Sequence, residues 1–189
     1  MDNFSTGAFD QIVSGTGAVV VFATGDTGVG SLRSAMRAIQ SNGTIRFASS
    51  IANQTIVLKS LLSTPAVNVT VDGETNNIAI SGNNSTQIFL VGSNGIRLRN
   101  LTLKNGKAAG GNGGSGQFGG GGGAGLGGAL FILGAAGGND VYLDHVTFVG
   151  NQAVGGAGGT GSQQTSGGGG GGGTIVGRLD IALTVMHHA

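Results

Sequence analysis

The chain has 189 residues, of which 42 are glycine and only 9% are charged, and its formal net charge is +1. This near-neutral composition gives no electrostatic reason to expect nucleic acid as a partner. The absence of cysteine excludes disulfides, thiolate catalysis and thiolate zinc sites. The apolar run at residues 18–23 is too short to cross a membrane, so we expect no membrane insertion.

The first expected elements are a strand and a helix. Residues 1–17 are predicted to form an N-terminal tail, and the valine-rich residues 18–24 a strand. Ser31 is a good N-cap for a helix over residues 31–41. The apolar positions of this helix recur at intervals of three and four residues, at Leu32, Ala35, Met36 and Ile39.

Short strands follow, separated by turns rich in Asn and Gly. They are expected at residues 44–47, 55–58, 67–71, 78–81, 88–91, 96–99 and 101–104. Such spacing is compatible with an antiparallel sandwich, a barrel or a β-solenoid.

An internal repeat favours the solenoid. Residues 95–116 align with residues 140–161 at an offset of 45 without a gap. The apolar positions match throughout: Ile96 with Val141, Leu98 with Leu143, Leu101 with Val146, and Leu103 with Phe148. The gapless match makes an antiparallel sandwich the weaker alternative.

Each repeat unit is predicted to contribute three short strands to a parallel β-helix coil. An earlier unit begins at Val67, with a spacing of 29 residues to Ile96. The third strand of the next unit is expected at residues 130–133, so the glycine-rich residues 109–128 form a loop before it. We expect this loop to be mobile or loosely packed, because ordering glycines costs backbone entropy with little burial in return.

The strand alternation predicts which side chains point outward and stack between layers. Asn100 is interpreted as a single-residue turn between two strands, and the repeat places His145 at the same position. A turn residue is therefore a better interpretation of His145 than a general base. The expected outward stacks are Arg97 over Tyr142, Arg99 over Asp144, and Thr102 over Thr147.

Residues 24–48, "TGDTGVGSLRSAMRAIQSNGTIRFA", resemble the N-terminal portion of bacterial right-handed parallel β-helix proteins of the pectate-lyase-like superfamily. The similarity extends over about residues 19–161. It implies an all-β, right-handed parallel β-helix in which the helix at residues 31–41 caps the first coil. It also implies an extracellular or cell-surface protein, although no export signal is visible. Some relatives in this superfamily are polysaccharide lyases, hydrolases or epimerases.

The residues offer little for catalysis, so an enzyme is the less favoured interpretation, and no catalytic residue, metal or cofactor is expected. Asp72 precedes a glycine, where a turn-forming role fits best. A polysaccharide or a host or cell-surface ligand is the expected partner. If the protein contacts glycans, the contact stripe is predicted at Arg97, Arg99, Lys104, Tyr142 and Asp144.

The sequence thus predicts a non-catalytic β-helix segment that acts as a structural or adhesive scaffold. The alternative is a carbohydrate-active β-helix, either a lyase or hydrolase or a glycan-binding module. Ice binding by outward threonines is a third class, disfavoured because only one threonine stack is visible. Residues 162–189 form a glycine-rich segment and an atypical tail. This tail is interpreted either as an improvised closing strand near residues 174–177 or as the result of truncation or a frameshift.

Overall fold

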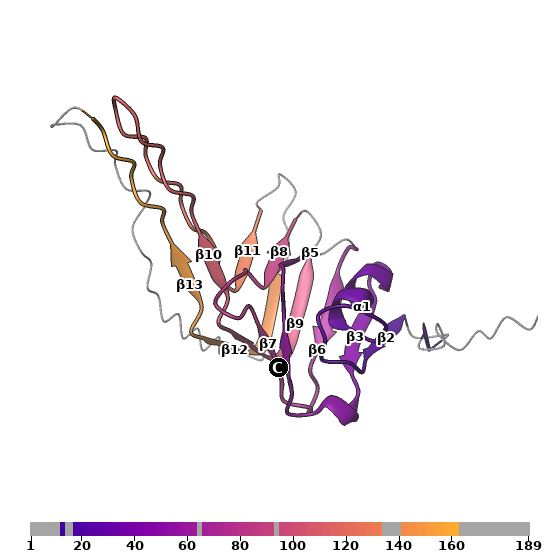
Figure 1. Ribbon diagram of the computed structural model, residues 1–189. Helices are drawn as coiled ribbons and strands as arrows, with labels where there is room; N and C mark the ends of the chain where they lie inside the picture. The colour runs from indigo at the N-terminus through magenta and orange to yellow at the C-terminus, as the bar shows by residue number, and fades with distance from the viewer. Residues whose placement is uncertain (1–11, 14–16, 64–65, 93–94, 134–140, 163–189) are drawn as a thin grey trace, which may run out of the picture.

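A computed structural model describes residues 12–13, 17–63, 66–92, 95–133 and 141–162 (Figure 1). Of the glycine-rich segment and tail predicted at residues 162–189, all but Ser162 lie outside the described residues. The elements in chain order are β1 (Ile12–Val13), β2 (Ala18–Val21), α1 (Leu32–Ala38), β3 (Thr44–Phe47), η1 (Ser49–Ile51), β4 (Thr55–Val57), β5 (Leu62–Ser63), β6 (Val69–Asp72), β7 (Ile78–Ser81), β8 (Phe89–Val91), β9 (Ile96–Lys104), β10 (Lys107–Ala109), β11 (Leu130–Ile132), β12 (Val141–Val149) and β13 (Gln152–Val154).

The strands form parallel stacks that share one core. β2, β3, β6 and the first halves of β9 and β12 pair one after another and form one stack. β4, β7 and the second half of β9 pair in the same way and form another stack. Because β9 belongs to both stacks, they join into one strongly curled sheet. β5, β8 and β11 form a separate parallel stack. In the described part of the chain only the β1–β2 pair is antiparallel, so the predicted all-β class is confirmed at the level of a mostly parallel, curled sheet with one helix.

The 45-residue repeat is confirmed as two adjacent parallel strands. β12 pairs with β9 so that Leu143 lies beside Leu98 and Thr147 beside Thr102. All eight paired positions keep the offset of 45 residues. An antiparallel arrangement of the two repeats is therefore excluded.

The predicted spacing of the preceding unit is wrong by two residues. Val69, rather than Val67, pairs with Ile96, so the spacing is 27 residues instead of 29. The reason is the turn residue Asn68, which has a φ of 53° and delays the start of β6. Its side-chain amide donates to Asn42 Oδ1 at 3.4 Å, at the equivalent turn of the previous layer.

The core lies between the stacks, and among the described strands it is less buried at β12 than at β9. Inward side chains of β9 such as Leu98 and Leu103 are fully buried. Their partners on β12, Leu143 and Phe148, pack against the core but are only half-buried. The described layers therefore bury the apolar face of β9 completely and that of β12 in part.

α1 is shorter than predicted and lies beside β2 and β3 (Figure 1). Ser31 is the N-cap, and its hydroxyl accepts the Ser34 amide at 3.2 Å, as its position predicted. The helix ends at Ala38 because Ile39 takes an extended conformation, which starts the turn into β3. The predicted apolar face is buried: Leu32, Ala35, Met36 and Ile39 all belong to the core.

A nearly buried ion pair holds α1 against the neighbouring loop. Arg33 Nη2 lies 2.7 Å from Asp26 Oδ1, and the two side chains are 12% and 5% exposed. The same guanidinium donates to the carbonyls of Ser60 and Leu61, at 2.6 and 2.9 Å. These contacts give Asp26 and Arg33 a structural role.

Left-handed residues, mostly asparagine, make the corners between strands. Asn100 interrupts β9 at a φ of 53°, and His145 interrupts β12 at the same φ. The prediction that both are turn residues is confirmed. Asn77 Nδ2 donates to Asn53 Oδ1 at 3.1 Å, so corners of successive layers also contact each other.

Replacing Asn100 with valine should destabilise the protein by about 2–3 kcal/mol, because a β-branched residue is strained at this φ. It also removes the hydrogen bond from Asn100 Nδ2 to Asp72 Oδ1, which is 2.8 Å long. Asn100→Gly tolerates the φ and loses only the hydrogen bond, so it should cost about 1 kcal/mol. Urea unfolding of both variants checks this, and equal costs would contradict the role of the corner.

The glycine-rich residues form an ordered projection rather than a loose loop, so the expectation for residues 109–128 is wrong. The projection extends away from the stacks, beyond β10 and β13 (Figure 1). It consists of a first outbound segment (residues 107–117), a return segment (residues 119–128) and a second outbound segment (residues 152–162), together named the glycine bundle. The outbound segments begin side by side as the parallel pair β10 and β13.

Backbone hydrogen bonds connect the three segments at every third residue. The first outbound segment donates to the second from Gly110, Gly113 and Gly116, over 2.8–3.2 Å. The return segment donates to the first from Gly120 and Gly123, and the second donates to the return segment from Gly156 and Gly159. A three-residue period is typical of extended polyproline II-like chains, which have no hydrogen bonds of their own. The expectation failed because it counted side-chain burial and left out backbone pairing.

Candidate functional site

Four of the five predicted stripe residues lie together on the outer face of β9 and β12. Arg97 pairs in register with Tyr142, and its guanidinium carbon lies 4.8 Å from the centroid of the tyrosine ring. Arg99 pairs in register with Asp144, and its Nε lies 3.0 Å from Asp144 Oδ2. The predicted stacks of these residues are confirmed. We name these four side chains the outward ladder.

Lys104 does not join the outward ladder. It lies at the end of the second half of β9, past the corner at Asn100. Its Nζ donates to Thr55 Oγ1 of β4 at 3.0 Å. Because the chain turns at Asn100, the outward direction of Lys104 differs from that of Arg97 and Arg99. The sequence predicted the turn but not the change of direction that it causes.

Arg99 connects carboxylates of two neighbouring layers. Its Nη1 lies 3.3 Å from Asp72 Oδ2 on β6, while its Nε contacts Asp144 on β12. Asp72 also accepts the amide of Glu74 at 2.8 Å, which confirms the turn role predicted for it. The Arg99 side chain is 42% exposed, so each ion pair contributes at most about 1 kcal/mol.

Asp144 is the residue whose acidity is changed by these contacts. The hydrogen bond from Arg99 is the largest cause that lowers the pKa of the Asp144 carboxyl, and contacts with His145 lower it further. His145 Nδ1 lies 2.6 Å from Asp144 Oδ1, on a ring that is 81% exposed. The ladder therefore favours the charged form of Asp144.

The pKa of Asp144 should lie below the ordinary aspartate value of about 4, and Arg99→Gln should raise it. A lowered pKa in the folded state stabilises the fold above the pKa of the unfolded state. This contribution is lost as the pH falls through the lower pKa of the folded protein. A titration followed by the NMR signal of the Asp144 carboxyl carbon measures both proteins. An unchanged pKa in Arg99→Gln would contradict the role of the guanidinium.

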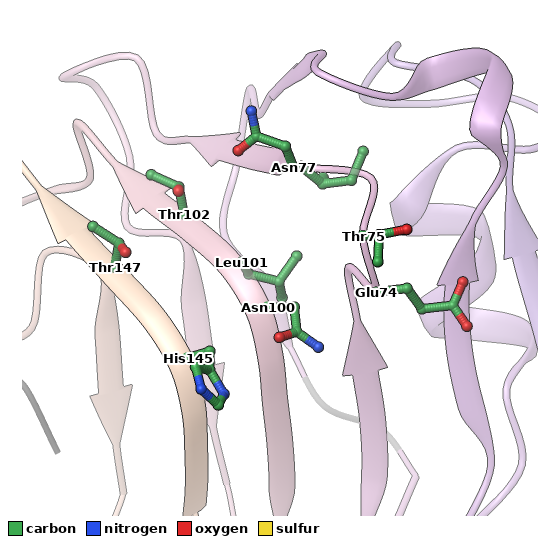
Figure 2. A pocket seen from close by; sticks show the side chains of 9 residues that line it. Glu74, Thr75, Asn77, Asn100, Leu101, Thr102, His145 and Thr147 are labelled. Carbon is green, nitrogen blue, oxygen red and sulfur yellow. The ribbon is translucent and has the colours of Figure 1, made fainter. Parts of the chain in front are cut away.

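A shallow hollow of about 280 Å³ lies next to the ladder, at the corners Asn100 and His145. Figure 2 shows Thr102 and Thr147 side by side on β9 and β12 along one side of it. The complete lining is Glu74, Thr75, Asn77, Ile78, Asn100, Leu101, Thr102, His145 and Thr147. Sequence reasoning missed this hollow, although its signal was present in the adjacent turn residues of successive repeats.

The titratable groups at the hollow are engaged with other residues. Glu74 pairs with Arg46 at 3.2 Å, and His145 contacts Asp144. Within the described ranges, His, Asp and Glu side chains form no group of three that could hold a metal ion. The arrangement can offer hydrogen bonds from threonine, asparagine and histidine to a ligand on the surface.

In the described part of the chain, no helix is long and apolar enough to cross a membrane. Comparisons of the chain with protein-family models, with curated proteins and with solved structures found no match.

Proposed function

We propose that the chain is a segment of a right-handed parallel β-helix, of the pectate-lyase-like kind, in a bacterial secreted or cell-surface protein. The supporting observation is the in-register stacking of successive layers. Val69 pairs with Ile96, and Ile96 pairs with Val141, so equivalent positions follow one another through three layers. The α1 helix, with its apolar face in the core next to β2, supports the idea of a capped first coil.

Its function is that of a non-catalytic scaffold that holds the glycine bundle in a defined position. Arg99 of the outward ladder pairs with Asp144 and Asp72, and Arg97 contacts the ring of Tyr142, which supports a structural use of these residues. The hydrogen bonds between segments at every third residue favour a stiff bundle over a flexible loop. A stiff projection on a stack of strands suits a protein that holds a contact surface at a fixed distance from the strands.

An adhesive role is supported by the apolar side chains of the projection. Phe118, at the turn between the outbound and return segments, is 69% exposed, whereas Leu126, which is 51% exposed, lies near the base of the return segment, where Gln87 donates to its carbonyl. Single exposed apolar side chains are common on protein surfaces, and Phe118 is distinguished by its place at the outer turn of the projection, where a partner can reach it. We therefore assign the adhesive contact to the turn of the bundle.

The second candidate is a glycan-binding or carbohydrate-active coil. The specific observation in its favour is the ring of Tyr142, which is 52% exposed and lies against Arg97. An exposed aromatic ring beside a guanidinium suits contact with an acidic sugar.

One experiment separates the two candidates. Beads that carry polygalacturonate, alginate or a neutral glucan, and a bacterial or animal cell surface, are incubated with the protein, with Phe118→Ser and with Tyr142→Ser. The scaffold proposal predicts no unsaturated, ultraviolet-absorbing product, and retention on a cell surface that falls in Phe118→Ser only. Product formation, or retention on a uronic-acid polymer that falls in Tyr142→Ser, would replace the scaffold with the second candidate.

A further inference from the structure

The glycine bundle takes the place of a short corner in the preceding layer. The last residue of β7 pairs with the last residue of β9, and β8 pairs with β11. Between these paired strands, the preceding layer needs only residues 82–88, whereas the layer of β9 runs through residues 105–129. The longer path contains the first outbound and the return segments. Residues 82–88 are thus the equivalent of the projection in the preceding layer, and we name them the socket.

Backbone hydrogen bonds place the socket against the base of the bundle. The carbonyl of Thr86 accepts the Lys107 amide at 2.9 Å, at the start of the first outbound segment. The Ile88 amide donates to the carbonyl of Gly128 at 3.2 Å, at the end of the return segment. The socket therefore contacts both segments at the points where they leave and re-enter the stacks.

The side chain of Gln87 adds a donor that reaches the return segment. Gln87 Nε2 donates to the carbonyl of Leu126 at 2.6 Å and to that of Gly127 at 3.1 Å. Gly127 has a φ of 63°, and the chain bends directly after it before it enters β11. Because a side-chain amide carries two N–H groups, Gln87 can hold both carbonyls at once. It thereby fixes the backbone at the bend between the return segment and the strands.

Asn151 makes a similar contact on the other side of the base. It directly precedes β13, and its Oδ1 accepts the Gly106 amide at 2.7 Å, just before β10. Its Nδ2 donates to the carbonyl of Leu103, near the end of β9, at 2.9 Å. One half-buried side chain thus joins the end of a stacked strand to the start of the projection. These two bonds restrict the angle between β9 and β10.

We propose that Gln87 and Asn151 are positioning residues that set the direction in which the glycine bundle projects from the stacks. This role rests on the proposed scaffold function, in which the bundle holds the contact at Phe118 in a defined place. Hydrogen bonds inside the bundle keep its segments together, but they do not fix its angle to the strands. The backbone bonds of the socket attach each segment at one point, and the two side chains add a second point of attachment.

Distances between spin labels test this role. Because the chain has no cysteine, Ser63→Cys on β5 and Gln117→Cys at the outer end of the bundle place labels at two exposed positions. Double electron–electron resonance should give one narrow distance distribution for this pair. Gln87→Met and Asn151→Ala should each raise the share of other distances at least about fivefold, the ratio that one net hydrogen bond confers. A distribution that neither variant changes would overturn the proposal.

A matched variant and hydrogen exchange separate positioning from stability. Gln152→Met is the matched control, because Gln152 is exposed at the base of the second outbound segment, and it should leave the distances unchanged. The amides of Gly113 and Gly159, inside the bundle, should exchange as slowly in Gln87→Met and Asn151→Ala as in the unaltered protein. Wider distances together with faster exchange at these amides would overturn the proposal, since the variants would then have opened the bundle itself.

The same distances separate the positioning role from the proposed function. A broad distribution in the protein that carries only the two labels would contradict the stiff projection of the proposed function, and the positioning role with it. A narrow distribution that persists in both Gln87→Met and Asn151→Ala would overturn the positioning role alone.

Discussion

Replacing Gly110 with alanine is expected to separate the segments of the glycine bundle and to lower its stability by about 1–3 kcal/mol. A Cβ at this position would overlap the carbonyl oxygen of Gly123. The segments must move apart, and the hydrogen bonds from Gly110 to Val154 and from Gly123 to Gly111 are lost. Hydrogen exchange read by mass spectrometry should show faster exchange in residues 107–128 and 152–162, with the strands of the core unaffected.

The neighbouring residue Gly111 provides a matched control. A Cβ on Gly111 would meet no atom within 4 Å, and the residue is exposed. Gly111→Ala should therefore keep the slow exchange of the bundle. It should be neutral or stabilising by up to about 1 kcal/mol, because alanine restricts the unfolded chain. Equal effects of the two substitutions would mean that the close approach of the segments does not hold the bundle together.

Replacing Arg33 with alanine is expected to cost about 3–5 kcal/mol, the largest effect of any single change considered for this protein. The substitution removes the cation that pairs with the carboxylate of Asp26, a side chain that is only 5% exposed. It also removes the donors that satisfy the carbonyls of Ser60 and Leu61. Urea unfolding measures the loss of stability, and α1 should lose its protection from hydrogen exchange first.

Two further variants make this expectation specific to the ion pair. Arg37→Ala, in the last turn of the same helix, removes an exposed arginine and should change the stability by no more than about 0.5 kcal/mol. The double variant Asp26→Asn/Arg33→Met removes both charges and should cost less than Arg33→Ala alone. If Arg33→Ala and Arg37→Ala cost the same, the contact between Arg33 and Asp26 does not anchor the helix.

Sequence reasoning predicted the register of β9 and β12 because two independent patterns agreed. The apolar alternation assigned an inward face to residues such as Leu98, and the gapless repeat placed Leu143 beside it. A shift by one residue would have put charged side chains into the core. Where the repeat was imperfect, before Val69, the expected register was wrong by two residues, because a left-handed corner residue is not visible in an apolar pattern.

The glycine bundle could not be predicted by reasoning from side chains. Its stability comes from backbone hydrogen bonds, and glycine is required where segments touch rather than where the chain bends. The available signal was the recurrence of glycine at every third position, for example at Gly110, Gly113 and Gly116, and at Gly122 and Gly125. This period was hidden because glycine also occupies many positions between them.

The strand register also explains why part of the candidate site could be predicted. Arg99 and Asp144 were expected to meet because register alone brings them together, and they do. Lys104 was grouped with them, but past the corner at Asn100 its ammonium group donates to Thr55. The Asp26 and Arg33 pair joins a loop to a helix, and neither strand alternation nor the repeat contains information about such a contact.

Disulfide formation between introduced cysteines tests most directly that the two repeats lie side by side in parallel. The chain has no cysteine of its own, so within one molecule a disulfide can form only between the two introduced cysteines. Thr102→Cys/Thr147→Cys and Arg97→Cys/Tyr142→Cys join positions that are paired in register, and both should form an intramolecular disulfide under mild oxidation. Thr102→Cys/Tyr142→Cys, which is five residues out of register, should stay reduced. A disulfide in this last pair, or in only one of the first two, would contradict the parallel stacking on which the account rests.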